Sequence, residues 1–159
     1  MRSTEHWLVH GHTQFELLLR ECRAAADILD WWALEQFVVK LIEGLRFHMA
    51  QEEEVLFPAY DAKCKPSHMS TLELYNEHSV IVENFRRLEK LIKSRSSEAV
   101  YDCIVALETL MTEHNEKEER TFLPFASHLL FEDRDELVLK LKNFLVTNKS
   151  RNWGVECSN

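Results

Sequence analysis

Hydrophobic residues recur at every third or fourth position along most of the chain, with polar residues between them. This spacing places the apolar side chains on one face of an α-helix. The pattern breaks at residues 28–31, 64–70, 94–97 and 128–133. These breaks leave four long helices, a short fifth helix near residues 133–148, and a C-terminal tail at residues 149–159 that has no period. The pattern therefore predicts an all-α fold.

Short connections between long helices favour antiparallel neighbours. We therefore expect an up-down-up-down four-helix bundle with a short C-terminal fifth helix, in one domain spanning residues 1–148. The fifth helix either closes the bundle or offers a face for a homodimer, and the periodicity leaves both open. Ser70 and Glu73 have the spacing of a capping box, so they are expected to begin the third long helix.

Composition limits the partners and the compartment expected for the protein. The formal charge of −8 argues against nucleic acid and anionic membranes as main partners. No apolar run approaches the ~20 residues that span a bilayer, and the N-terminus lacks the apolar stretch of a signal peptide. The four cysteines lie far apart, as is typical of reduced thiols. We expect a cytoplasmic protein with no nucleic-acid and no membrane partner.

An internal repeat with an offset of 66 residues carries the candidate chemistry. A histidine, a glutamate four residues later and a proline six residues after that occur twice, as His48, Glu52 and Pro58 and as His114, Glu118 and Pro124. The same offset separates His12 from His78. Histidine and carboxylate side chains bind transition metals. The repeat predicts a metal site built from two copies of one helical hairpin.

Counting from the predicted turns places the histidines at one height. Residues equidistant from the turn of an antiparallel hairpin lie side by side. His12 and His48 are centred on residue 30, whereas His78 and His114 are centred on residue 96. Each histidine is about 18 residues from its turn, or roughly 27 Å along the helix axis. Each repeated glutamate follows its histidine by one helical turn and shares its face. We expect all six side chains in one buried layer.

Two buried carboxylates repel each other, and burying them without a cation costs several kcal/mol. One ion accepts at most about six ligands, whereas two ions that share both carboxylates use all six side chains symmetrically. Zinc usually takes four ligands with fewer carboxylates, so iron is expected first and manganese second. The predicted metal ligands are His12, His48, Glu52, His78, His114 and Glu118.

At these residues the chain resembles the hemerythrin-like proteins, also called HHE cation-binding domains. The resemblance covers Glu5 to about His128 and includes the Leu-Phe-Pro and Phe-Leu-Pro runs after the two repeated glutamates. It implies a centre of two non-haem iron ions with an oxo or hydroxo bridge. It further implies dioxygen, or a related diatomic or peroxide ligand, as the partner.

The chain departs from the oxygen carriers of that family. The carriers have a further histidine one turn before the third-helix ligand, where this chain has Leu74. In the carriers the fourth-helix carboxylate is an aspartate five residues after the histidine, whereas here Glu118 follows His114 by four residues. Further side chains near the layer are read either as additional ligands or as solvated groups: Glu16, Tyr75 and Glu77. Three other glutamates are expected to face solvent or to hydrogen-bond to the ligands: Glu53, Glu54 and Glu119.

Several functions fit this centre. The first is binding of dioxygen or a related small ligand for storage, delivery or sensing. The second is a redox enzyme that acts on peroxide, nitric oxide or iron, and the third is iron sensing or iron donation. Neither a catalytic nucleophile nor a second cofactor motif is visible. The sequence favours small-ligand binding over catalysis and leaves the enzyme question open.

Overall fold

The computed structural model describes the backbone of residues 4–148 and the side chains of residues 11–144. Within this range every regular element is helical, so the predicted all-α fold is confirmed. The predicted tail at residues 149–159 lies outside the described residues. The elements, in chain order, are α1 (Thr4–Asp27), α2 (Trp31–Gln51), η1 (Glu52–Leu56), α3 (Phe57–Asp61), α4 (Leu72–Lys93), α5 (Ser97–Lys117), η2 (Glu118–Phe122), α6 (Leu123–Leu129), η3 (Phe131–Asp133) and α7 (Arg134–Asn148).

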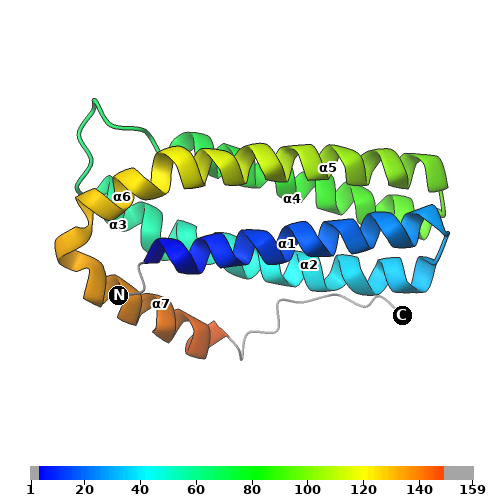
Figure 1. The fold of residues 1–159 in the computed structure, drawn as a ribbon, viewed down its shortest axis with the longest axis horizontal. Helices are drawn as coiled ribbons and strands as arrows, with labels where there is room; N and C mark the ends of the chain where they lie inside the picture. Colours follow the sequence, from blue (N-terminus) through cyan, green and yellow to red (C-terminus); the bar gives the residue numbers. More distant parts are fainter. Residues whose placement is uncertain (1–3, 149–159) are drawn as a thin grey trace.

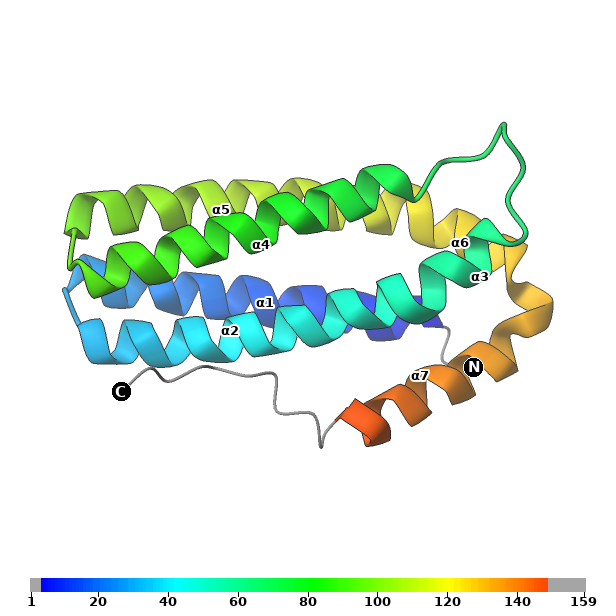
Figure 2. The same ribbon diagram turned by 180° about the vertical axis from the view of Figure 1, so that it is seen from behind.

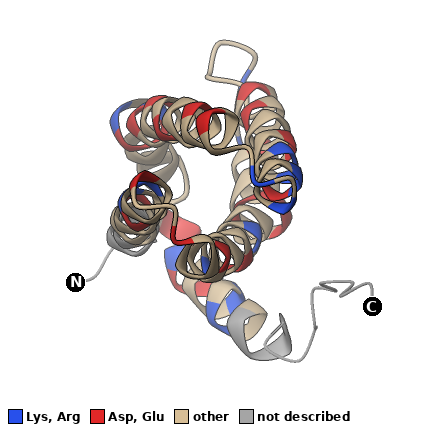
Figure 3. Ribbon diagram, turned by 90° about the vertical axis from the view of Figure 1, so that its right-hand side faces the viewer, with Lys and Arg blue, Asp and Glu red and all other residues tan. Residues whose placement is uncertain are grey.

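Four long helices, α1, α2, α4 and α5, lie side by side around a common axis (Figure 1). Helix α1 packs against α2 and α5, and α4 packs against α5 and α2. Seen along the bundle axis, α7 lies outside the ring of four long helices (Figure 3). Acidic and basic residues are distributed over the helices of the ring (Figure 3). Helix α7 packs against η1. None of the described helices is long and apolar enough to cross a membrane.

Two short turns join the long helices in pairs, α1 to α2 and α4 to α5, at the same end of the bundle (Figure 2). Leu29 and Arg95 have φ angles of 57° and 53°, in the left-handed region. They are related by the 66-residue offset, so both hairpins reverse direction in the same way at the same place. Asp30 then caps α2, because its carboxylate accepts the Ala33 N–H at 3.0 Å.

At the opposite end, the second and fourth long helices change from α-helix to one π-helical turn each. In η1 the Phe57 N–H donates to the carbonyl of Glu52, and in η2 the Leu123 N–H donates to the carbonyl of Glu118. Each hydrogen bond spans five residues instead of four. Pro58 and Pro124 follow directly. A proline ring collides with the carbonyl four residues earlier in an α-helix, and the wider turn relieves that collision.

The helical period alone predicts no such widening, and the start of α4 also differs from expectation. Ser70 Oγ accepts the Leu72 N–H at 3.2 Å, and the N-cap residue Thr71 makes no side-chain cap bond. Thr71 instead donates its hydroxyl to Asp61, and the Glu73 carboxylate pairs with Lys117. The predicted capping box is therefore wrong, because both of its side chains have other partners.

Buried apolar residues form two separate clusters along the bundle axis. The long-helix cluster consists of Phe15, Leu19, Cys22, Ala25, Leu34, Val38, Leu41, Ile42, Leu45, Met49, Ile81, Phe85, Leu88, Ile92, Val100, Cys103, Ile104, Leu107 and Met111. The broken-helix cluster consists of Leu56, Phe57, Tyr60, Leu74, Phe122, Leu123, Ala126, Leu130 and Leu137. Along the chain, Glu52 lies between Met49 of the first cluster and Leu56 of the second, and Glu118 lies between Met111 and Phe122.

Candidate metal centre

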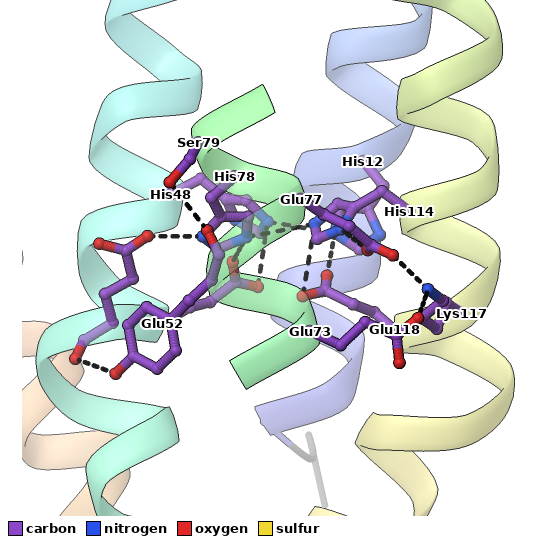
Figure 4. Close-up of polar contacts among 12 residues, drawn as sticks. His12, His48, Glu52, Glu73, Glu77, His78, Ser79, His114, Lys117 and Glu118 are labelled. Atoms are coloured by element: carbon purple, nitrogen blue, oxygen red, sulfur yellow. Dashed lines mark hydrogen bonds and ion pairs between the residues drawn. The ribbon is translucent and has the colours of Figure 1, made fainter. Parts of the chain in front are cut away.

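The structure brings the six predicted side chains together in one layer of the bundle (Figure 4). Each of the four long helices contributes one histidine, and the two glutamates come from the first residues of the π-helical turns. All six are buried, with exposures between 0% and 7%. Such burial of six ionisable groups in one place requires a physical explanation.

The histidines form two close pairs, one from each hairpin. The Nε2 atoms of His12 and His48 lie 3.1 Å apart. The Nε2 atoms of His78 and His114 lie 3.2 Å apart. In both pairs the imidazole rings meet edge to face, with centroids 5.0 and 4.8 Å apart. Each hairpin therefore presents two ring nitrogens to one point.

The two glutamates connect these pairs across the bundle. Glu52 Oε1 lies 3.2 Å from His48 Nε2, and Glu52 Oε2 lies 3.3 Å from His78 Nε2. Glu118 Oε2 lies 3.2 Å from His12 Nε2, and Glu118 Oε1 lies 3.5 Å from His114 Nε2. Each carboxylate therefore has one oxygen toward each histidine pair. Two overlapping groups result, each made of two histidines and both glutamates with their ligand atoms within 4.8 Å.

This donor set fits transition metal ions. Two ligand atoms bound at right angles to one ion, with bonds of about 2.1 Å, lie about 3 Å apart. The separations between the facing nitrogen and oxygen atoms of the layer, 3.1 to 3.5 Å, are close to that value. Furthermore, none of the four carboxylate oxygens of Glu52 and Glu118 has a hydrogen-bond partner of good geometry in the described part of the chain. Buried carboxylate oxygens in that condition fit bonding to a cation.

Three of the histidines donate a hydrogen bond from Nδ1–H, on the outer side of the ring, to a further glutamate. The Nδ1–H of His12 donates to Glu119 at 2.9 Å, and that of His78 donates to Glu53 at 2.7 Å. These two contacts are related by the repeat. A carboxylate on Nδ1 fixes the tautomer that leaves Nε2 free to bind a metal. Of the two roles expected for these glutamates, the structure shows hydrogen bonding.

The other neighbouring side chains lie around the layer instead of within it. Glu77 accepts the Nδ1–H of His114 at 2.8 Å, on the outer side of the imidazole. The Tyr75 hydroxyl donates to the carbonyl of Glu53 at 3.2 Å. Glu16 is half-buried and Glu54 is exposed, and neither belongs to the two described metal-binding groups.

Aromatic rings cover two of the imidazoles. Phe15 meets His48 edge to face with centroids 5.3 Å apart, and Phe57 stacks on His78 at 5.7 Å. Gly44 makes the first contact possible, because a Cβ at that position would lie 2.9 Å from the Phe15 ring. These rings contribute apolar walls beside the layer.

The charges of the layer are strongly coupled. Burial opposes protonation of His12, yet the adjacent Glu118 carboxylate raises the pKa of His12 to about 9. Burial likewise opposes ionisation of Glu118, but His12 and the other histidines lower its pKa to about 2. Burial and repulsion by His12 lower the pKa of His48 to about 3. Burial and the Glu118 charge raise the pKa of Glu52. Without a cation, these shifts favour the protonated form of His12 and disfavour the ionised form of Glu52.

The family model of the hemerythrin HHE cation-binding domain matches residues 3–126. The chain belongs to this family. The match spans α1 through most of α6, which includes all six residues of the layer. No curated protein and no solved structure matches the chain. The hemerythrin-like domain and its buried histidine and glutamate groups together indicate metal binding.

Among the outer partners of the histidines, the sequence predicts either solvent exposure or hydrogen bonds to the ligands for Glu53 and Glu119, and it does not predict the contact of Glu77 with His114. A signal was present for two of them, since Glu53 and Glu119 repeat with the same offset as the ligand candidates. Glu77 has no such signal, because the equivalent residue in the first hairpin is Gly11. Only the packing of α4 against α5 shows that this side chain reaches His114.

Proposed function

We propose that this hemerythrin-like domain holds a non-haem di-iron centre that binds dioxygen or a related small ligand, for storage, delivery or sensing. The observation that carries this proposal is the pair of overlapping groups that share both glutamates. One ion would be held by His12 and His48 and the other by His78 and His114. Glu52 and Glu118 would bridge the two ions.

Iron is favoured because the layer mixes imidazole nitrogen with carboxylate oxygen, a set that suits iron and then manganese. Each ion would have four protein ligands, namely two histidines of its own and the two shared glutamates. Further coordination positions would remain for an external ligand. When bound, the metal pair would supply open coordination positions for a small ligand and electrons for its reduction. The protein orients the imidazoles through their outer glutamates and excludes water with apolar clusters beside the layer.

The proposal includes the domain limits and the chain topology expected from sequence. The up-down-up-down order is supported by the two short turns at one end of the bundle. It is further supported by the contact of His12 with His48 and of His78 with His114, because each pair is equidistant from its turn. Residues 1–148 would form the di-iron domain.

A redox enzyme acting on peroxide, nitric oxide or iron is the second candidate. Leu74 occupies the position of the carriers' additional histidine and is fully buried in the broken-helix cluster. Both groups therefore have the same two-histidine composition. A centre in which both ions have open coordination positions favours catalytic turnover more than a carrier's centre does, where only one ion is open. Iron sensing or donation would use the same ligands through the gain and loss of metal.

Optical spectra of iron-loaded, anaerobically reduced protein test the proposal. We expect a charge-transfer band when oxygen is added, and a reversible carrier loses that band when oxygen is purged. A permanent change to an oxo-bridged diferric spectrum would favour the enzyme, and peroxide and nitric oxide would then be tested as substrates. Absence of any iron-dependent band would contradict a di-iron centre.

Variants test the ligand assignment by metal content. We expect His48→Ala and Glu118→Ala to lower bound iron well below two ions per chain. His128 is exposed and lies outside the described metal-binding groups, so His128→Ala is the matched control and should retain full iron content. Full iron content in both ligand variants would refute the assignment.

A further inference from the structure

The two histidine pairs are not supported alike by their surroundings. In the second pair both imidazoles donate Nδ1–H to a carboxylate, His78 to Glu53 and His114 to Glu77. In the first pair, His12 donates to Glu119. The residue of the first hairpin that corresponds to Glu77 is a glycine, which has no side chain to offer.

Glu77 is itself held in place by its neighbours. Its second carboxylate oxygen pairs with the Lys117 ammonium, which also contacts Glu73 (Figure 4). These three side chains link α4 to α5 along the outer edge of His114. The first hairpin has Gln51 in the place of Lys117. Gln51 is buried, and its Nε2 atom has no hydrogen-bond partner among the described residues.

The glycine leaves the outer edge of His48 more open than the corresponding edge of His114. A Cβ built at Gly11 would lie 3.4 Å from His48 Nδ1. His48 is 7% exposed, whereas the other three histidines of the layer are 1% to 3% exposed. Glu53 and Glu119 act equivalently, so they do not distinguish the pairs. The difference between the pairs therefore centres on Glu77 and its glycine counterpart.

A carboxylate on the outer nitrogen orients a histidine ligand and raises its basicity, and loss of such a partner typically weakens metal binding 10- to 100-fold. We propose that the position formed by His78 and His114 fills with metal first, and that Glu77 is the positioning residue that makes the two positions unequal. This inference rests on the proposed two-metal centre. It adds the order in which the two positions bind metal, which their identical ligand sets alone do not predict.

Zinc is a suitable probe because it is diamagnetic and each group offers four ligands. The full chain, labelled with ¹⁵N-histidine and freed of metal, would receive one and then two equivalents of Zn²⁺ while the imidazole NMR signals are recorded. We expect the His78 and His114 signals to shift with the first equivalent. The His12 and His48 signals should shift with the second. Simultaneous shifts of all four, or earlier shifts of His12 and His48, would overturn the proposal.

Substitutions of Glu77 distinguish a positioning role for this residue from a general effect on folding. Glu77→Ala should weaken the first binding step about 10-fold or more and bring the two zinc affinities together. Glu77→Gln keeps an oxygen that accepts the His114 Nδ1–H, so it should retain part of the difference between the two zinc affinities. Glu83→Gln is the matched control on the same helix, because Glu83 is exposed and pairs with Arg86. It should leave both affinities unchanged.

The outcomes distinguish this inference from the proposed function. Unchanged separation of the two affinities in Glu77→Ala, or an equal loss at both positions, would overturn the role of Glu77. Two equal affinities in the unaltered protein would overturn the order of loading and leave the two-metal centre standing. Failure of the unaltered protein to bind Zn²⁺ or iron would refute the proposed centre itself.

Discussion

The two apolar clusters of the bundle have different construction. The long-helix cluster is formed by four regular α-helices, and its buried residues are all apolar. The broken-helix cluster is formed around two π-helical turns and short helices, and it includes Tyr60, whose hydroxyl donates to the carbonyl of Met69 at 3.0 Å. The six ionisable side chains lie where one construction changes to the other. Both clusters contact the layer, through Phe15 on His48 and Phe57 on His78, but only the broken-helix cluster is built on the turns that begin at Glu52 and Glu118, so we expect it to depend more on the layer.

Removal of metal should have the largest effect and should separate the two clusters. A ligand present at 1,000 times its Kd stabilises the folded state by about 4 kcal/mol. A chelator should therefore lower the Tm by roughly 8–16 °C for a domain of this size. Hydrogen exchange should show the greatest loss of protection in η1, η2 and α3. Equal loss of protection throughout α1 and α5 would contradict the comparison.

Leu41→Ala should damage the long-helix cluster regardless of metal. Leu41 is fully buried in that cluster. Truncation to alanine should lower the free energy of unfolding by about 2–5 kcal/mol. Urea denaturation should give the same loss for loaded and chelated protein. Leu139→Ala, at a residue 58% exposed, is the control and should change stability by less than about 0.5 kcal/mol.

Glu52→Gln should change stability in opposite directions with and without metal. Burial and the Glu118 charge raise the pKa of Glu52, so at neutral pH the metal-free fold opposes its ionisation. Glutamine does not ionise, so the metal-free variant should be more stable than the unaltered protein at neutral pH. The loaded variant should lose stability, because it lacks a bridging carboxylate. Calorimetric unfolding checks both signs, and a loss in both states would exclude this account. Glu54→Gln, at an exposed residue, should do neither.

A smaller effect should follow from pH. Since the pKa of His12 is raised to about 9 from 6.5, its stabilising contribution is complete below pH 6.5 and is lost as the pH rises through 9. The unfolding free energy of metal-free protein should fall over that interval, by at most about 1.4 kcal/mol per pH unit for one proton. Loaded protein should lack this decline, because the metal replaces the proton. Stability that rises with pH in metal-free protein would contradict it.

Sequence was sufficient to predict the layer because straight α-helices convert residue number into height. His12 and His48, each counted from the turn near residue 30, lie in contact in the structure. The same counting does not reveal the rotation of one helix about another. The contact of Glu77 with His114 depends on that rotation and could not be derived. Likewise, periodicity predicts the short fifth helix but not its packing against η1.

The π-helical turns were missed for a different reason. Each turn is only five residues long and shifts the phase of the hydrophobic pattern once, while the repeat of three to four residues continues on both sides of it. Their sequence signal is the proline six residues after each repeated glutamate, at Pro58 and Pro124. A proline within a helical pattern usually marks an end or a kink. Here it marks a widened turn that begins at a candidate ligand.

Each π-helical turn amounts to an insertion of one residue into an α-helix, so a single deletion should remove it. Deletion of Val55 would leave His48 and Glu52 on their shared face. It would rotate every following residue by about 100° about the helix axis. Phe57 and Tyr60, both fully buried, would then turn away from the broken-helix cluster. The inserted residue thus separates two requirements on one helix, so that the ligand candidates and the core residues after them can each face inward.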